Sequence, residues 1–194
     1  MSFHGCSRKL AAAEDAKASI ESDIHPTSAV VPAQLDITDD GRQLHQCGPA
    51  IVEHLKSKSL AGLDVLVNNA AVITHLFQEV YAVNVFETVA VTESVRPLLN
   101  RGGTIVDVSS AIRSLALLLK TPGIPGMPEY SSSKTALNNL TVQWAIEEQK
   151  NGSGTRVVSI YPGAFSASSS ASKTWVLVNS GNMIKSEGIK VPEK

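Results

Sequence analysis

The feature that most constrains the fold is an alternation of short apolar runs with longer helix-like stretches. Residues 63–67, 104–108 and 156–160 are short runs of the kind found in strands buried on both faces of a sheet. Residues 77–99 and 129–149, which separate these runs, have helical character. Strands that alternate with helices are joined by right-handed crossovers into a parallel sheet. The sequence therefore predicts an α/β fold.

Further elements are expected on either side of this pattern. Residues 9–22 are rich in alanine and charge and predict a helix, 30–35 predict a strand, and 42–58 predict a second helix. Residues 111–128 contain several prolines and glycines, so the second half of this segment is expected to be a loop.

Beyond residue 163 the alternation ends. Residues 166–172 are a serine-rich, low-complexity tract that favours turns and mobility. Residues 175–178 form a short apolar run that is a candidate for a last strand, although no neighbouring feature fixes it.

Polar or glycine-rich residues follow each of the three buried-type strands, at 68–71, at Ser109-Ser110 and at 161–163. Any one of these segments is an ordinary polar turn. In open α/β sheets, however, ligands bind beyond the carboxyl ends of the strands. Three such ends together predict a ligand site.

Tyr130 and Lys134 provide a chemical function for that site. A spacing of four residues on a helix places the phenol and the ammonium on one face, about one turn apart. A nearby positive charge lowers a tyrosine pKa from its reference value of about 10, so this pair predicts a proton donor or acceptor. By itself the spacing is common, and its weight comes from the surrounding motifs.

Composition excludes several other classes of function. A formal net charge of −1 gives no electrostatic footprint for nucleic acid or an anionic membrane. Cys6 and Cys47 match neither a disulfide framework nor a metal-ligand spacing, and the five histidines are scattered, so no metal site is expected. There is no signal-peptide pattern or membrane-length apolar run, which favours a cytoplasmic location.

Taken in order, the motifs resemble the short-chain dehydrogenase/reductase family, in particular its carbonyl-reductase-like members. The resemblance covers about residues 7–163. It rests on the segments 7–9, 35–39, 64–71, 83–85, 105–110, 130–134 and 161–163. It implies a Rossmann-like, doubly wound parallel sheet, with residues 1–165 as a partial dinucleotide-binding domain and 166–194 as a poorly defined tail.

The resemblance also implies roles for individual residues. Tyr130 would be the general acid for carbonyl reduction or the base for alcohol oxidation. Lys134 would lower the tyrosine pKa and bind the nicotinamide ribose. Ser110 would hold the substrate oxygen, and Asn84 would support Lys134 through a water. The remaining cofactor contacts would come from Arg8, Asp36, Asn68, Ala70, Pro162 and Gly163.

The basic pair Arg8-Lys9 suggests which cofactor is used. Arginine after the second strand of such a fold accommodates the 2′-phosphate of NADP, whereas a carboxylate there binds the ribose of NAD. NADP is therefore expected, with NAD as the less favoured cofactor. The alternative for the basic pair is a solvated start of a helix.

One element of the family is not found in the sequence. Neither G-x-x-x-G-x-G nor G-x-G-x-x-G occurs, so the strand, glycine-rich turn and helix that receive the pyrophosphate are expected to be missing at the N-terminus. Residues 2–6 would be a remnant of the second strand. The lost strand would be central, between those at 30–35 and 63–67, and would leave an edge of the latter unpaired.

Three hypotheses follow. The first is an oxidoreductase that acts on a small carbonyl or alcohol substrate, with a homo-oligomer expected by family analogy. The second is a catalytically inactive relative that binds no dinucleotide by itself. The third is an incomplete gene product.

Overall fold

The structure is a computed structural model that describes residues 2–7, 9–23, 25, 29–34, 52–53, 56–57, 62–110, 127–161 and 174–178. Its sheet has six strands in the order β2-β1-β6-β3-β4-β5. Their bounds are β1 Ser2–Ser7, β2 Ala29–Gln34, β3 Leu63–Asn68, β4 Leu99–Val108, β5 Arg156–Ile160 and β6 Thr174–Val178.

Helices connect the strands. The first, α1, spans Leu10–Ile20 and continues into a 3₁₀ turn, η1, at Glu21–Asp23. Between β3 and β4 the chain is helical in four consecutive pieces. These are α3 Phe77–Tyr81, the π-helix η2 Ala82–Glu87, α4 Thr88–Val95 and the 3₁₀ turn η3 Arg96–Leu98. The longest helix, α6, spans Pro128–Asn151 and precedes β5.

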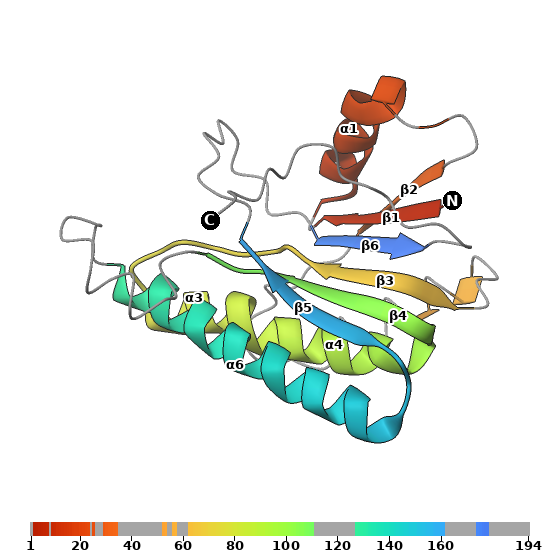
Figure 1. Cartoon of the computed structure of the whole chain (residues 1–194). Helices are drawn as coiled ribbons and strands as arrows, with labels where there is room; N and C mark the ends of the chain where they lie inside the picture. Colours follow the sequence, from red (N-terminus) through yellow and green to blue (C-terminus); the bar gives the residue numbers. More distant parts are fainter. Residues whose placement is uncertain are drawn as a thin grey trace, which may run out of the picture.

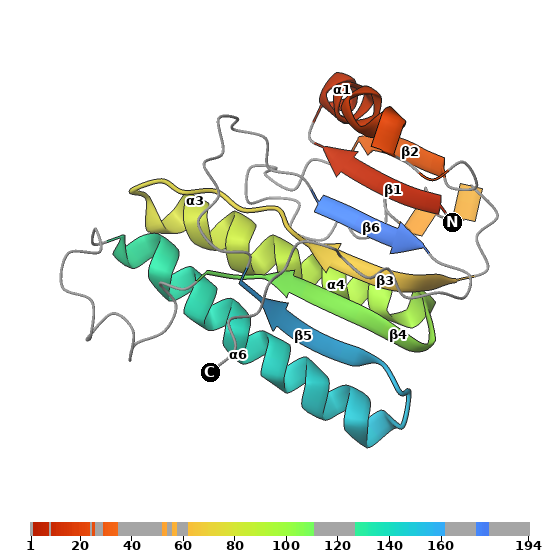
Figure 2. The same ribbon diagram turned by 45° about the horizontal axis from the view of Figure 1, so that its top comes forward.

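The helices lie on both sides of the sheet. Figures 1 and 2 show α1 beside β1 and β2, and α3, α4 and α6 together on the opposite side, under β3, β4 and β5. Strands with covered faces are expected to be apolar, and Leu63, Leu66 and Ile105 are at most 1% exposed. These three residues form the main core cluster with Cys6, Val91 and Val95. The predicted α/β fold is confirmed.

The carboxyl ends of the middle strands meet at one edge of the sheet. β3, β4 and β5 are parallel, with Asn68 opposite Asp107 and Val108 opposite Ile160. The polar residues that follow these strands therefore emerge side by side, as the sequence predicts.

Helix α6 crosses under this part of the sheet. It begins at Pro128, whose fixed φ and missing N–H suit the first helical turn. It ends at Gly152, which takes the left-handed conformation with φ 63° that glycine adopts without strain. Its inward side buries Leu137 and Trp144 in the same stripe as Lys134. Core packing therefore fixes the rotation of the helix that carries Tyr130 and Lys134.

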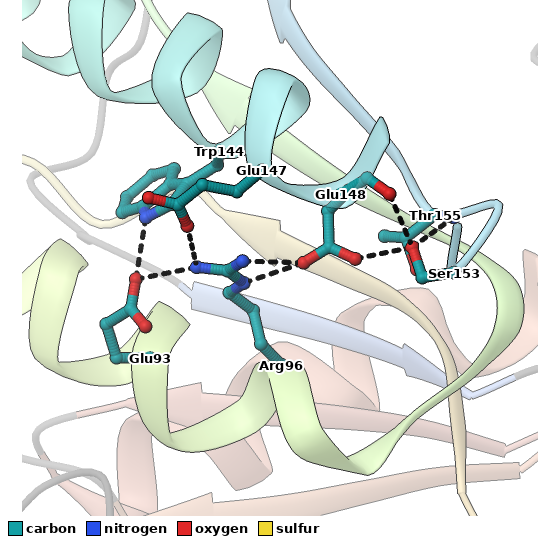
Figure 3. A network of polar contacts seen from close by, with 7 residues as sticks. All are labelled: Glu93, Arg96, Trp144, Glu147, Glu148, Ser153 and Thr155. Carbon is teal, nitrogen blue, oxygen red and sulfur yellow. Dashed lines mark hydrogen bonds and ion pairs between the residues drawn. The ribbon is translucent and has the colours of Figure 1, made fainter. Parts of the chain in front are cut away.

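A polar brace ties α4 to the far end of α6 (Figure 3). Arg96 donates to Glu148 through Nε at 3.0 Å and through Nη2 at 2.6 Å, and it also pairs with Glu93 and Glu147. Trp144 donates its indole N–H to Glu93 at 2.7 Å. Burial acts to raise the pKa of Glu148, but hydrogen bonds from Ser153 and Arg96 outweigh it and lower that pKa.

The N-terminal expectations need correction. Residues 2–6, expected as a remnant of the second strand, do lie in that position, but they are part of a strand of six residues, Ser2–Ser7, in parallel register with β2. The central position that the sequence predicts to be empty, between the strands at 30–35 and 63–67, lies between β1 and β3. It is filled by β6, so the predicted unpaired edge of β3 is wrong.

The other predicted elements agree closely with the structure. The expected helix at 9–22 appears as α1, the strand at 30–35 as β2, and the candidate strand at 175–178 as β6. Strand β4 begins at Leu99, earlier than the predicted start at 104. The expected helix 42–58 and the loop in 111–128 lie mostly outside the described residues.

Candidate functional site

Tyr130 and Ser110 meet at the carboxyl edge of the sheet. Tyr130 lies in the first turns of α6, Ser110 lies just beyond β4, and a side-chain hydrogen bond joins them. Burial of the phenol raises the Tyr130 pKa, and the bond with Ser110 lowers it only in part. The lowered pKa expected from the sequence is therefore not found here, because desolvation outweighs the favourable contacts. At neutral pH the phenol carries its proton.

Lys134 lies beside the tyrosine, with its ammonium 5.8 Å from the centre of the Tyr130 ring. The residue is 2% exposed, and Nζ donates to the carbonyl oxygen of Val108 at 2.8 Å. Burial lowers its pKa from 10.5 to about 8, although the nearby Asp107 carboxylate acts in the opposite direction. The group is still mostly a cation at neutral pH, and it is poised to titrate just above it.

Asn84 is held by a widened helical turn. It lies in η2, and the Thr88 hydroxyl donates to the carbonyls of Val83 and Asn84 on this turn. The fully buried Asn84 accepts from Val72 N–H at 2.8 Å, and its amide donates to Val72 O at 3.0 Å and Ser133 Oγ at 3.1 Å. Single π-turns inside helices often mark functional sites. Here the turn joins the residues after β3 to the helix of Tyr130.

Asn68 and Asp107 form an internal link that sequence reasoning did not assign. Asn68 Nδ2 donates to Asp107 Oδ1 at 2.8 Å and to Thr92 Oγ1 at 2.9 Å. Thr141 of α6 donates to the other Asp107 oxygen at 2.7 Å. Burial raises the Asp107 pKa, while Asn68, Thr141 and Lys134 oppose that rise. The signal in the sequence that could have identified Asp107 is its position as a carboxylate within the apolar run 104–108.

The two serines after β4 differ in their surroundings. Ser109 donates its backbone N–H to Ile160 O at 2.9 Å and so continues the ladder to β5. Its hydroxyl is buried without a hydrogen-bond partner among the described residues. Ser110, in contrast, reaches Tyr130. The geometry favours Ser110 over Ser109 as the partner of the tyrosine, in line with the sequence prediction.

The structure thus brings together Ser110, Tyr130 and Lys134, and ties Asn84 to the helix of Tyr130 through Ser133. Ala70 follows β3 at the same edge, while the side-chain N–H groups of Asn68 point into internal hydrogen bonds. The remaining predicted cofactor contacts lie outside the described residues, and their roles stay predictions. These are Arg8, Asp36, Pro162 and Gly163.

Within the described part of the chain, no group of three or more His, Cys, Asp or Glu side chains is arranged to hold a metal ion. No helix among the described residues is both long and apolar enough to cross a lipid bilayer.

The sheet order and the site at its carboxyl edge define the Rossmann-like class of α/β protein. More specifically, the chain belongs to the short chain dehydrogenase family, whose pattern matches residues 2–175. This family binds NAD(P).

Individual relatives agree with this assignment. The chain is 30% identical over 172 residues to the uncharacterized oxidoreductase YusZ of Bacillus subtilis, covering 83% of this chain and 52% of that protein. It is 35% identical over 101 residues to an L-xylo-3-hexulose reductase of Hypocrea jecorina, covering 44% and 31% respectively. The chain thus spans at most about half the length of the curated relatives that it matches.

Solved structures show the same fold. The Pseudomonas aeruginosa RhlG/NADP active-site complex superposes with a TM-score of 0.68 at 22% identity, over 84% of this chain and 61% of that one. A dehydrogenase/reductase of Sinorhizobium meliloti superposes with a TM-score of 0.60 at 28% identity, over 79% and 59%.

The described residues fit one half of a dinucleotide and not the other. In the arrangement expected from the sequence, Tyr130, Ser110 and Lys134 would lie at the nicotinamide end, where the hydride would be exchanged. At the pyrophosphate end the fold requires a parallel central strand that leads into the N-terminus of a helix. The described strand in that position is β6, which runs the other way.

Proposed function

We propose that the protein is an oxidoreductase that uses NADP(H) and a small carbonyl or alcohol substrate, with Tyr130 as general acid and base. The observation that carries the proposal is the contact set around one phenol: a hydrogen bond from Ser110 and the ammonium of Lys134 beside the ring. Titratable groups with perturbed pKa values cluster at functional sites, and burial shifts the pKa values of both Tyr130 and Lys134 here.

The residues of the chain handle the proton. Tyr130 holds its proton at neutral pH, as the donor to a carbonyl oxygen must, although the raised pKa by itself makes the phenol a weaker acid. The Lys134 cation favours the phenolate that this transfer leaves behind. Ser110 is close enough to the phenol to orient a substrate oxygen toward it. The hydride itself would be supplied by the dinucleotide.

Asn84 would act as a positioning residue. Its amide ties the segment after β3 to Ser133, and Ser133 in turn donates to Tyr130 O at 2.7 Å. These bonds would hold the first turns of α6, which carry Tyr130 and Lys134, against the segment after β3. The preference for NADP over NAD rests on Arg8 in the sequence.

The test is ketone- or quinone-dependent oxidation of NADPH by the purified chain. Tyr130→Phe removes only the hydroxyl, and the rate is expected to fall by about 10²- to 10⁴-fold because the general acid is lost. Tyr81→Phe is the matched control, since Tyr81 packs against Phe77 and Phe86 in α3 and η2, outside the contact set around Tyr130. Equal activity of the two variants would refute the role of Tyr130.

A second candidate is a non-catalytic relative that binds no dinucleotide by itself. The antiparallel strand β6 at the centre of the sheet favours it, because the described residues then offer no pyrophosphate cradle. A ligand that binds the native state raises its melting temperature by mass action. An NADPH-dependent rise in Tm would therefore exclude this candidate.

A homo-oligomer formed through η2 and α6 is part of the proposal. Exposed apolar side chains on these helices support it, with Phe86 at 52%, Val142 at 55% and Ile146 at 40% exposure. Sedimentation of the chain with Val142→Glu, which places a charge at an exposed apolar position of α6, is expected to show a smaller species than the wild type.

A further inference from the structure

The centre of the sheet holds one strand that runs against all the others. β1 is parallel to β2, and β3, β4 and β5 are parallel to one another, whereas β6 is antiparallel to both β1 and β3. Figure 1 shows the arrow of β6 (blue) between those of β1 and β3 and pointing the other way. A Rossmann-like sheet has a parallel strand in this position.

β6 pairs with the backbone on both of its sides. Against β1 its register runs from Thr174 opposite Cys6 to Val178 opposite Ser2. Against β3 it runs from Trp175 opposite Val67 to Leu177 opposite Val65. The facing edges of β1 and β3 would otherwise expose unpaired N–H and C=O groups in the middle of a sheet. The slot between them is thus a binding site for one extended segment.

The segment that fills the slot can come from the same chain. β5 ends at Ile160 and β6 begins at Thr174, and both points lie at the carboxyl edge of the sheet. The step from β5 to β6 crosses three strand spacings, or about 15 Å. A dozen or so residues can span about 40 Å when extended, so the connection reaches without strain.

β6 is also the main link between two parts of the molecule. Among the described elements, α1 packs on β1 and β2, and the principal contacts of β1 outside this unit are with β6. Cys6 is the residue of β1 that joins the core cluster of Leu63 and Leu66. Without β6, the unit formed by β1, α1 and β2 would have little attachment to β3.

The direction of β6 has a consequence for ligand binding. A parallel strand would present its carboxyl end at the edge where Tyr130 lies, and a helix starting there would receive a pyrophosphate. β6 presents its amino end at that edge, opposite Cys6 and Val67. Its carboxyl end, at Val178, leaves at the other side of the sheet.

We propose that residues 174–178 are an internal replacement strand that binds in cis between β1 and β3, and that the sheet closed in this way is a dinucleotide-free state. The assignment of the strand is independent of the proposed function. The second part concerns the cofactor of that function and rests on it.

Cys6 allows a direct test, because it lies opposite Thr174 in the register. Directly opposed residues of antiparallel strands have Cα atoms about 4.5–5.5 Å apart, within the range that a disulfide spans. The full chain would carry Cys47→Ser and Thr174→Cys and be oxidised with diamide, which takes up the two electrons and two protons released. The control is Cys47→Ser with Trp175→Cys, one residue further along β6 and opposite Gly5.

An intrachain disulfide that forms with Thr174→Cys, and at least about ten times less with Trp175→Cys, is the expected result because one residue of slip changes the face of the strand. Disulfide-linked dimers would show that the slot takes the strand of a second copy and would overturn binding in cis. Equal crosslinking of both variants, or none, would overturn the register.

The oxidised Thr174→Cys chain then tests the second part. Locked in the closed sheet, it is expected to show no rise in Tm with NADPH, whether or not the reduced chain shows one. A rise equal to that of the reduced chain would mean that the closed sheet binds the dinucleotide, and would overturn the claim while leaving the strand assignment intact. If neither the oxidised nor the reduced chain shows activity that depends on Tyr130, that result would count against the proposed function and not against the strand assignment.

Discussion

The two halves of the sheet differ in strand direction and in the number of helices that pack against them. β3, β4 and β5 are parallel and are backed by α4 and α6, and the described residues of the candidate site lie just beyond these strands or on η2 and α6 beside them. β2, β1 and β6 are backed by α1 alone in the described structure, and their connection to the other half depends on one short antiparallel strand. We call these the catalytic half and the N-terminal half.

The difference shows that the packing of the proposed proton-transfer site is separable from that of a dinucleotide cradle. Tyr130 and Lys134 are fixed by the packing of α6, through Leu137 and Trp144, and by the β4 carbonyl of Val108. None of these contacts requires the centre of the sheet. The cradle, in contrast, requires a strand of one particular direction at that centre. One half therefore keeps the residues of the proposed site in contact, while the other differs in topology from a Rossmann-like sheet.

The largest expected effect is on core packing. Leu66→Ala in the catalytic half, at a site with 0% exposure, is expected to lower the free energy of unfolding by about 2–5 kcal/mol. Val30→Ala in the N-terminal half, at 8% exposure, is expected to cost nearer 1 kcal/mol. Urea unfolding of both variants measures the difference. Equal losses would mean that the halves are equally well packed.

The next effect is the pH dependence that Lys134 confers. Its pKa in the folded chain is about 8, which lies below the ordinary lysine value of 10.5 that applies in the unfolded chain. The depressed pKa means that the folded state disfavours the proton, so its contribution to stability is present above pH 10.5 and is lost as pH falls to 8. We expect the stability of the wild type relative to Lys134→Met to rise by up to about 3 kcal/mol over that window.

Chemical denaturation at several pH values between 7 and 11 measures this difference. Cys6 also has a raised pKa, but it is present in both proteins and cancels, whereas Tyr130 contacts Lys134, so both proteins are compared in the Tyr130→Phe background. A constant difference across the range would contradict the buried, partly desolvated state of Lys134.

A moderate effect is expected at the brace of Figure 3. Arg96→Met keeps the side-chain stem but leaves Glu148, whose side chain is 10% exposed, without its cation. Thermal or urea unfolding is expected to show a loss of about 1–3 kcal/mol. Glu147→Gln removes an ion pair whose carboxylate is 54% exposed and is expected to change stability by less than about 1 kcal/mol. A larger loss of stability for Glu147→Gln than for Arg96→Met would contradict the view that the buried pair with Glu148 contributes most.

The smallest expected change is in the reactivity of Cys6. Burial raises its thiol pKa from 9.0 to about 11, so little of the nucleophilic thiolate is present at pH 8. In the Cys47→Ser chain, alkylation by iodoacetamide is expected to be about 100-fold slower than for a free thiol. A rate near that of free cysteine would show that β1 separates readily from the core and that the N-terminal half is open.

The sequence predicts the catalytic half well. Its strands are continuous apolar runs with polar ends, and Tyr130, Lys134 and Ser110 come together as their spacing implies. What the sequence does not disclose is the balance of forces on a buried group. The Tyr130 pKa rises because desolvation depends on the depth of the phenol, which no spacing reports. Asp107 was also missed, since its partners Asn68 and Thr141 are distant in sequence.

The N-terminal half is harder to predict for a topological reason. Residues 175–178 were identified as a strand from their local composition, but local composition does not determine a partner. The pairing of β6 with β1 joins opposite ends of the chain, and its direction follows from the edge at which β5 ends. A long-range pairing of this kind leaves no periodic signal in the sequence.

Backbone hydrogen exchange tests most directly whether β6 holds the two halves together. Val176→Pro places a residue without an N–H in the middle of β6, between its partners His4 and Leu66, whereas Val176→Thr keeps the N–H and serves as the control. With Val176→Pro, amides of β1, β2 and α1 are expected to lose their protection while those of β4, β5 and α6 keep it. Unchanged protection in β1 and β2, or an equal loss across the whole sheet, would contradict this account.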